Sequence, residues 1–388
     1  MEVSAFDPTK LAEQIMEAIE MEKSKQKKLN LMVLGKTGVG KSTLINNLFA
    51  ERLADTGLGH PVTSEIKQWE KKNFPLTIYD TPGLELGGSN DIEKLMKEIS
   101  KVIKDCANTG NMDNAIHCIL YCISAVSSRF EKEEADFIKR FSVENAEYKI
   151  PVIIVLTKSY SKREAEELKT HIKKENLNVV QIVSVLAEPF EIDEGLVVPA
   201  FGLDTLSDVI LNAIPDSLRD TFIAVQKADI KKKVQKAQIA VASASSVAAA
   251  TGAIPIPVAD AFLLVPNQIA MLGSITAIFG LSIEKSALAA IVTATLGTTG
   301  ATIGGKTAVT SLLKLIPGAG TIIGGAISGA VAAAITAALG EAYIGLMTAI
   351  STGELKQSDL QTEKGKKYLS DLFKANLSLK RDNNGNRI

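Results

Sequence analysis

The stretch "LNLMVLGKTGVGKST", residues 29–43, restricts the fold of this chain more than any other part of its sequence. An apolar run ends at Gly35, and a second glycine, Gly40, comes directly before Lys41. Glycines at these positions let the backbone curl so that successive N–H groups point inward and surround an anion. A helix beginning near Lys41 adds the positive end of its dipole. The pattern therefore predicts a strand, a phosphate-binding loop and a helix, in that order.

The residue types in this loop suit a nucleoside triphosphate bound with Mg²⁺. Lys41 is expected to bring a full charge to the β- and γ-phosphates, and the Ser42 hydroxyl is expected to bind the metal ion. Backbone and side-chain contacts to the phosphates are predicted for the whole loop: Gly35, Lys36, Thr37, Gly38, Val39, Gly40, Lys41, Ser42 and Thr43.

Two later segments extend the predicted site. "DTPG" ends an apolar run, so Asp80 is expected to hold Mg²⁺ through water and the Gly83 N–H to meet the γ-phosphate. The same four residues are also typical of a β-turn, and their spacing from the phosphate loop favours the site. In "GHPVTSEI", Thr63 is expected to reach Mg²⁺ in the triphosphate state. The γ-phosphate would order these segments and its loss would release them. The catalytic set is therefore Lys41, Thr63 and Gly83, and the metal set is Ser42, Thr63 and Asp80.

Short apolar runs alternate with helical patterns through the first half of the chain. This alternation predicts an α/β fold with a mostly parallel, doubly wound sheet covered on both faces. Polar alternation over residues 64–72 predicts one added edge strand, which would be antiparallel. The expected strands of the main sheet are residues 29–35, 76–80, 115–124, 151–158 and 179–187.

Charge drops sharply in the second half of the chain. Residues 237–353 contain six charged side chains and are rich in Ala, Gly, Ile and Val. We expect an all-α hydrophobic domain there, with a boundary near 215–236. The predicted division is an amphipathic N-terminal helix within 1–28, a nucleotide domain 29–215, an Ala/Gly-rich all-α domain 216–380, and a disordered tail 381–388.

Two uncharged stretches, 286–305 and 315–340, are long enough to span a bilayer, and G-x-x-x-G pairs within them would permit close helix crossings. A soluble bundle packed through small residues would look similar, and prolines interrupt the region. We favour conditional membrane association, by peripheral docking more than by insertion, in a cytoplasmic protein at the inner face of a membrane. The formal net charge of −1 provides no field that would attract nucleic acid, and none is expected as a partner.

The ordered motifs "GKTGVGKST", "PVTSE", "DTPGLE", "TKSY" and "VSVLA" make residues 29–215 resemble an Era-like GTPase of the translation-factor-related P-loop class. The segment "IPIPVADAFLLVPNQIAMLGSITAIFGLS" is similar to the hydrophobic C-terminal domain of unknown function that follows many bacterial Era-like GTPases. It is also similar to the helical domain of immunity-related GTPases, which are dynamin-like and act at membranes as oligomers. The resemblance implies GTP and GDP as ligands with Mg²⁺, GTP hydrolysis, and a homodimer or oligomer formed through the nucleotide domain.

The base-reading motif of that class is altered here. Thr157 and Lys158 match it, but Tyr160 stands where the class has the aspartate that selects guanine. Lys158 can still lay its stem over the base. Backbone N–H groups of the loop Ser184, Val185 and Leu186, which ends at Ala187, can still reach the guanine O6. The missing aspartate removes one charge-assisted hydrogen-bond pair to the base, worth about 1.5–3 kcal/mol. We therefore expect the site to bind GTP but to discriminate less strongly between guanine and other bases.

A second departure concerns hydrolysis. Leu84 follows Gly83, where many small GTPases carry a glutamine that orients the attacking water, so slow intrinsic turnover is expected. Glu85, Arg129, Lys36 or a partner could supply the missing group. Two functions stay open: a GTPase switch that controls assembly or membrane contact, and a nucleotide-binding scaffold with negligible turnover and relaxed base specificity. A ribosome-assembly role is disfavoured, because no appended RNA-binding domain or basic face is seen.

Overall fold

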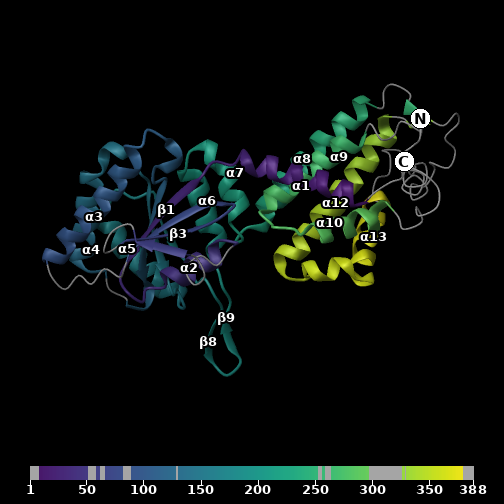
Figure 1. Cartoon of the computed structure of the whole chain (residues 1–388). Coiled ribbons are helices and arrows are strands. Elements are labelled where there is room, and N and C mark those ends of the chain that lie inside the picture. Colours follow the sequence, from purple (N-terminus) through teal and green to yellow (C-terminus); the bar gives the residue numbers. More distant parts are fainter. Residues whose placement is uncertain are drawn as a thin grey trace. The chain divides into compact units, whose positions relative to one another are not determined.

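The computed structural model describes residues 8–50, 58–61, 66–81, 89–127, 130–251, 256–257, 264–296, 326–327 and 329–378. The chain forms two compact units (Figure 1). One is Gln26–Asp229, and the other combines Met1–Lys25 with Ile230–Ile388. Helix α7 (Asp216–Val225) therefore lies in the unit Gln26–Asp229, and the N-terminal helix lies in the other, helical unit. The tail 381–388 is outside the described residues.

A seven-stranded sheet organises the unit Gln26–Asp229, in the order β2-β3-β4-β1-β5-β6-β7. Strands β4, β1, β5, β6 and β7 are parallel, and β3 and β2 are antiparallel additions at one edge. This confirms the predicted mostly parallel sheet; β2 was not predicted. The bounds are β1 (Leu29–Gly35), β2 (Leu58–Pro61), β3 (Lys67–Lys71), β4 (Phe74–Asp80), β5 (Cys118–Ser124), β6 (Val152–Thr157) and β7 (Gln181–Ser184).

Helices cover both faces of this sheet, because the parallel strands carry apolar side chains on each side. On β1, Met32 and Leu34 contribute to one core, and Leu31 and Val33 contribute to the other. The first core is closed by α3 (Ser89–Ala107), α4 (Lys132–Glu144) and α5 (Lys162–Lys174). The second is closed by α2 (Lys41–Leu48), α6 (Leu203–Ala213) and α7. Figure 1 shows the two helical layers on opposite sides of the sheet.

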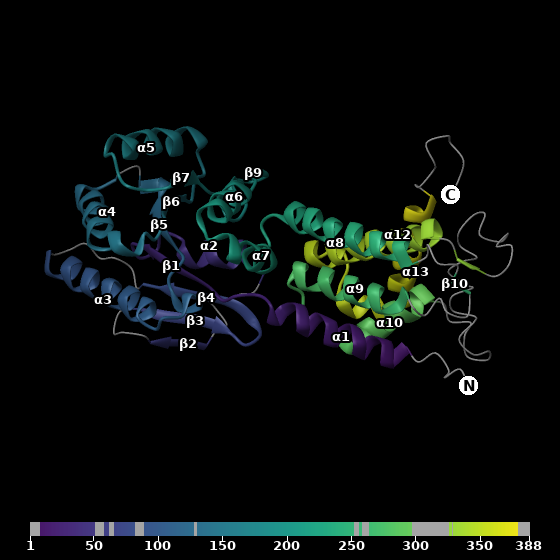
Figure 2. The same ribbon diagram turned by 90° about the horizontal axis from the view of Figure 1, so that it is seen from above.

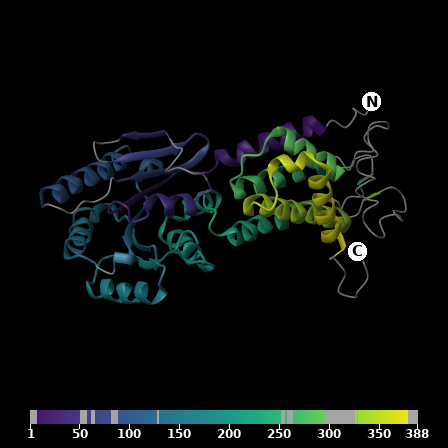
Figure 3. The same cartoon turned by 90° about the horizontal axis from the view of Figure 1, so that it is seen from below.

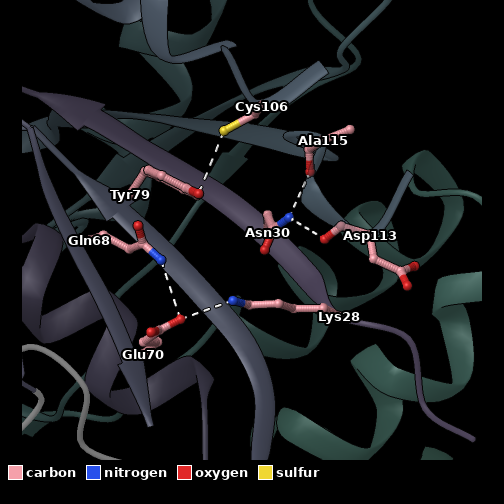
Figure 4. A network of polar contacts seen from close by, with 8 residues as sticks. All are labelled: Lys28, Asn30, Gln68, Glu70, Tyr79, Cys106, Asp113 and Ala115. Carbon is pink, nitrogen blue, oxygen red and sulfur yellow. Dashed lines mark hydrogen bonds and ion pairs between the residues drawn. The ribbon is translucent and has the colours of Figure 1, made fainter. Parts of the chain in front are cut away.

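Polar contacts fix the end of β1 that lies opposite the phosphate loop (Figure 4). Buried Asn30 donates its Nδ2 to the carbonyl oxygens of Asp113 and Ala115, at 2.8 and 2.9 Å. Near it, Glu70 accepts from Lys28 Nζ at 2.9 Å, which joins β3 to the residue before β1. Because these contacts hold the start of β1 against the neighbouring segments, β1 presents the following loop from a fixed position.

The helical unit packs α1 (Pro8–Ser24) against α9 (Val265–Phe279) and α10 (Lys285–Leu296), and α8 (Ile230–Thr251) against α9 and α12 (Gly329–Thr352). Figure 2 shows α8, α9 and α12 together, and in Figure 3 the purple α1 runs beside the green helices. Helix α13 (Glu363–Ser378) packs on α12 and α10. A Cβ on Gly340 would lie 2.5 Å from a Val241 methyl, so this glycine permits the close approach of α12 and α8.

Helix α12 has the length and composition to cross a membrane, with a mean hydropathy of 1.6. Its most apolar window is 67% buried within the structure, as a core helix of a bundle would be. Of the two predicted spans, 286–305 is described only to residue 296, and 315–340 only at 326–327 and from 329 onward. Membrane insertion therefore stays a prediction.

Candidate nucleotide-binding site

The phosphate loop connects β1 to α2 through three glycines with positive φ. The φ angles are 141° at Gly35, 71° at Gly38 and 101° at Gly40. Gly35 is also the point of closest approach to β5, because a Cβ there would lie 2.4 Å from the Cys122 carbonyl oxygen. Only glycine satisfies both conditions at residue 35. The predicted strand, curled loop and helix are thus present, and Thr37 and Ser42 are exposed at the loop.

Lys41 occupies the centre of this loop and is only 9% exposed. Its Nζ donates to the carbonyl oxygens of Gly35, at 2.8 Å, and Lys36, at 3.1 Å. Burial lowers the pKa of Lys41, and the nearby Asp80 carboxylate opposes that change. The loop therefore holds one buried ammonium beside its own curled backbone, as binding of a polyphosphate requires.

Asp80 ends β4, next to β1 in the sheet. Burial raises the pKa of its carboxyl group, and Lys41 opposes the rise. Asp80 Oδ1 is buried and has no hydrogen-bond partner among the described residues. A buried carboxylate oxygen without a partner among the described residues, together with the exposed Ser42 hydroxyl next to Lys41 in the chain, fits the hard oxygen ligands that Mg²⁺ takes. When bound, Mg²⁺ would neutralise phosphate charge here, held by Ser42 and Asp80.

The Thr-Lys pair at the end of β6 ties the base side of the site to the phosphate loop. The Thr157 hydroxyl is buried and is shared between the carbonyl oxygens of Val39 and Ile123. Lys158 has a φ of 52° and donates its Nζ to the Gly38 carbonyl oxygen at 2.7 Å. Both residues predicted to contact the base therefore also hold the phosphate loop in place.

A cavity of about 170 Å³ opens beside Lys158. Tyr160 forms part of its wall and stacks on Phe190, with ring centroids 3.8 Å apart and planes at 26°. Phe190 begins a two-stranded hairpin, β8 (Phe190–Asp193) and β9 (Leu196–Val198), that no motif had predicted. The other lining residues are Gly40, Thr43, Leu44, Thr157, Val185, Leu186, Ala187, Glu188 and Pro189. Tyr160 thus replaces an acidic side chain with an aromatic surface.

The backbone donors expected for the guanine O6 are mostly engaged elsewhere. The Val185 N–H donates to the Leu156 carbonyl oxygen at 2.8 Å, and the Leu186 N–H donates to that of Phe201 at 3.0 Å. The Ser184 hydroxyl is buried, with no partner among the described residues. Ala187 also faces the cavity, and its N–H has no backbone acceptor in the described chain. Base contacts from Ser184, Val185 and Leu186 stay predictions, and these bonds favour Ala187 over Val185 and Leu186.

Lys36 points away from the phosphate loop toward the start of α4. Its Nζ lies 2.6 Å from Glu131 Oε2 and 3.4 Å from Glu134 Oε2. Burial alone would lower the pKa of Lys36, but the two carboxylates together raise it. Lys36 is therefore an ion-paired loop residue here, and a role in hydrolysis would require it to leave this pair.

Several predicted residues lie outside the described part of the chain: Thr63, Gly83, Leu84, Glu85 and Arg129. Three residues at the site were missed by the sequence analysis, namely Asn47, Glu188 and Phe190. Asn47 lies on the phosphate-loop helix and bonds to Glu188, 141 residues away. Apolar alternation around Gly195 in "FEIDEGLVV" could have indicated the hairpin that begins at Phe190.

Comparison with known families agrees with this geometry. Residues 30–158 match the family described as 50S ribosome-binding GTPase, and residues 219–376 match a domain of unknown function, DUF697. Residues 30–158 therefore match a P-loop GTPase domain, and GTP binding and hydrolysis are general properties of that domain family. The first family's ribosome binding is a property of that family and does not follow for this chain.

Septins are among the curated proteins that this chain is similar to. Neuronal-specific septin-3 of Danio rerio is 29% identical over 170 residues, which cover 38% of this chain and 46% of the septin. Septin-9 of Homo sapiens is 33% identical over 135 residues, which cover 29% of this chain and 23% of the septin. The chain thus spans less than half the length of these curated relatives.

Solved structures of GTP-binding proteins are similar at low identity. A probable GTP-binding protein engB is 21% identical, with a TM-score of 0.33, and the match covers 47% of this chain and 97% of that one. Toc33 from Arabidopsis thaliana, in complex with Mg²⁺ and GMPPNP, is 19% identical, with a TM-score of 0.29, and the match covers 47% of this chain and 80% of that one.

Proposed function

We propose that this protein is a Mg²⁺-dependent switch that binds and slowly hydrolyses GTP, and that its nucleotide state controls self-assembly or membrane contact of the helical unit. The observation that carries the proposal is the phosphate loop. Lys41 is buried among loop carbonyls opposite the orphaned Asp80 oxygen, beside a cavity that Thr157 and Lys158 join to the same loop.

In this proposal, Lys41 and the loop N–H groups hold the phosphates, and Ser42 and Asp80 hold the metal ion, with Thr63 joining in the triphosphate state. Gly83 senses the γ-phosphate. Slow turnover follows from Leu84, which offers no group to orient water. Lys36 serves catalysis only after it leaves Glu131 and Glu134, because its ammonium is ion-paired with their carboxylates.

Self-assembly is supported by apolar side chains exposed beside the base cavity. Phe190, Ile192, Leu196 and Val197 of the β8–β9 hairpin are 38–59% exposed. Exposed apolar clusters of this kind are typical of interaction sites. Because Phe190 of this hairpin also lines the cavity, a bound nucleotide would change the surface through which two copies assemble.

Membrane contact is supported by the composition of the helical unit and by exposed apolar residues on α8. Ile239 and Val247 are 71% and 50% exposed on the same helix that begins with a lysine run. Lysines beside an apolar face favour an anionic lipid surface. We place the protein in the cytoplasm, docking at the inner face of a membrane.

The test is phosphate release from GTP at several protein concentrations, with and without anionic liposomes, and with Lys41→Ala as the inactive control. The switch requires turnover that depends on Mg²⁺ and Lys41 and that rises per molecule with protein concentration or liposomes. GTP binding with no turnover under any condition would instead favour the alternative, a nucleotide-binding scaffold. Equal nucleotide affinity in wild type and Lys41→Ala would exclude both.

A further inference from the structure

The base cavity contains a carboxylate that the sequence motif does not account for. Among the residues that line the cavity, Glu188 is the acidic one, and it comes from the loop after β7. Tyr160 occupies the position where an aspartate was expected, two residues after Lys158. The cavity therefore lacks the acidic side chain expected at position 160, but it has a different acidic side chain, Glu188, from the loop after β7.

Glu188 is held in a defined position, although it is exposed. Asn47 Nδ2 donates to Glu188 Oε1 at 2.8 Å and also to the Thr43 carbonyl oxygen at 2.9 Å. Thr43 itself lines the cavity, so this amide anchors the carboxylate to the helix that carries the phosphate loop. Within the described part of the chain Asn47 is the partner given for this carboxylate, so Oε2 of Glu188 and the second lone pair of Oε1 are available to a ligand.

The chemistry of a carboxylate at this place selects among purines. Guanine presents two donors on one edge, N1–H and N2–H, which a carboxylate accepts together. Hypoxanthine presents only N1–H, adenine presents an acceptor at N1, and xanthine places a carbonyl oxygen where guanine has its amino group. A fixed carboxylate therefore attracts guanine and repels adenine and the xanthine oxygen.

We propose that Glu188 is the guanine-selecting residue of this site, in place of the aspartate that Tyr160 has replaced, and that Asn47 is its positioning residue. Tyr160 and Phe190 form an aromatic wall next to the base, and Lys158 lies along the phosphate side. This inference rests on the proposed GTP binding and adds how guanine is chosen. In this proposal the site stays specific for guanine in spite of Tyr160, because the loop after β7 supplies the selecting carboxylate.

The experiment measures the affinities of GTP, ITP, XTP and ATP, each with Mg²⁺, by calorimetry on the full chain. The wild type should bind GTP first, ITP next, and XTP and ATP least. Glu188→Gln offers one acceptor and one donor, which match N1–H and the oxygen of xanthine. This variant should lose about ten- to a hundred-fold in GTP affinity and gain in XTP affinity.

Three further variants separate this role from folding and net charge. Glu191→Gln removes the same charge three residues away, outside the cavity lining, and should leave every affinity unchanged. Asn47→Ala should move the ratio of GTP to XTP affinity in the same direction as Glu188→Gln, but less. Tyr160→Asp should restore GTP preference when combined with Glu188→Gln.

The outcomes distinguish this inference from the proposed function. If Glu188→Gln leaves the ratio of GTP to XTP affinity as in the wild type, the role of Glu188 is wrong while GTP binding stands. An equal shift in Glu191→Gln would reduce the effect to net charge and also overturn it. If the wild type binds none of the four nucleotides, or binds them independently of Lys41, the proposed function itself fails.

Discussion

Each unit of this protein buries a lysine, and the two lysines have different surroundings. Among the described residues, Lys41 in the nucleotide domain and Lys233 in the helical unit are 9% and 1% exposed. Lys41 Nζ lies among the carbonyl oxygens of its own loop and interacts with the Asp80 carboxylate. Lys233 Nζ donates at 2.7 Å to the carbonyl oxygen of Phe279, the last residue of α9, where the helix dipole is negative.

Burial lowers the pKa of both lysines, but with different results. Asp80 opposes the change at Lys41, so the countercharge helps to keep this ammonium ionised. At Lys233 burial lowers the pKa to about 7. The comparison teaches that a buried lysine indicates a binding site when a countercharge and a curled backbone accompany it, and that burial by itself indicates only packing.

The same substitution at both positions is the strongest way to break this comparison. Lys41→Met should reduce GTP affinity by at least about a hundred-fold, because it removes the one full charge expected at the β- and γ-phosphates. Lys233→Met should leave GTP affinity unchanged. Fluorescent-nucleotide titration measures both. Similar losses in the two variants would mean that Lys41 affects GTP affinity through folding, as Lys233 would, and that the two buried lysines do not differ in role.

The backbone of the phosphate loop gives a second large effect. Gly35→Ala places a Cβ 2.4 Å from the Cys122 carbonyl oxygen at a φ of 141°, so we expect it to lower the free energy of unfolding by about 3 kcal/mol. Gly38→Ala meets nothing within 4 Å and should lower it by about 1 kcal/mol, through backbone strain alone. Urea unfolding followed by fluorescence of Trp69, the one tryptophan, reports this domain. Equal effects would contradict the close contact with β5.

The sequence predicted the phosphate end of the site well, because that end is built from neighbours in the chain. Gly35, Gly40 and Lys41 lie within seven residues, so their local conformations determine the loop. The parallel sheet was predictable for a similar reason, since its strands are continuous apolar runs. The helical unit was predictable as a class only, because Ala/Gly-rich composition fits both a bundle and a membrane domain.

The base end was not predictable, because it is assembled across long separations. Asn47 and Glu188 are 141 residues apart, and their contact appears only once α2 and the loop after β7 meet. Tyr160 signalled a departure from the motif, but its stacking on Phe190 depends on a hairpin inserted after the last strand. Backbone donors named from the motif, such as those of Val185 and Leu186, are engaged by tertiary contacts that no local pattern shows.

The free energy of unfolding of the helical unit should depend on pH through Lys233, which gives a further test of the difference between the two buried lysines. Because the pKa of Lys233 is lowered to about 7 in the folded state, the unfolded chain binds more protons between pH 7 and about 10.4. The free energy of unfolding should therefore rise by about 2 kcal/mol from pH 7 to pH 9, and stay flat with respect to this group below pH 7. Urea unfolding followed by far-ultraviolet circular dichroism measures it.

Lys233→Met should remove this pH dependence, and Lys231→Met, an exposed lysine on the same helix, should retain it. If the slope between pH 7 and pH 9 persists in Lys233→Met, another group titrates and the reading of Lys233 is wrong. The nucleotide domain provides an internal reference, because Trp69 fluorescence reports its unfolding separately.

The smallest expected effect compares two buried threonines, one in each unit. The Thr157 hydroxyl joins the end of β6 to the phosphate loop at Val39, and the Thr276 hydroxyl lies 2.7 Å from the buried Tyr343 hydroxyl between α9 and α12. Valine at either position keeps the shape and removes the hydroxyl, so each variant should lose about 1 kcal/mol of stability. Only Thr157→Val should also weaken GTP binding, by about three- to ten-fold, because it loosens the loop that holds the phosphates. Titration and urea unfolding of both variants separate the two effects. A loss of GTP affinity in Thr276→Val would show that packing of the helical unit reaches the nucleotide site, and the functional division between the two units would have to be abandoned.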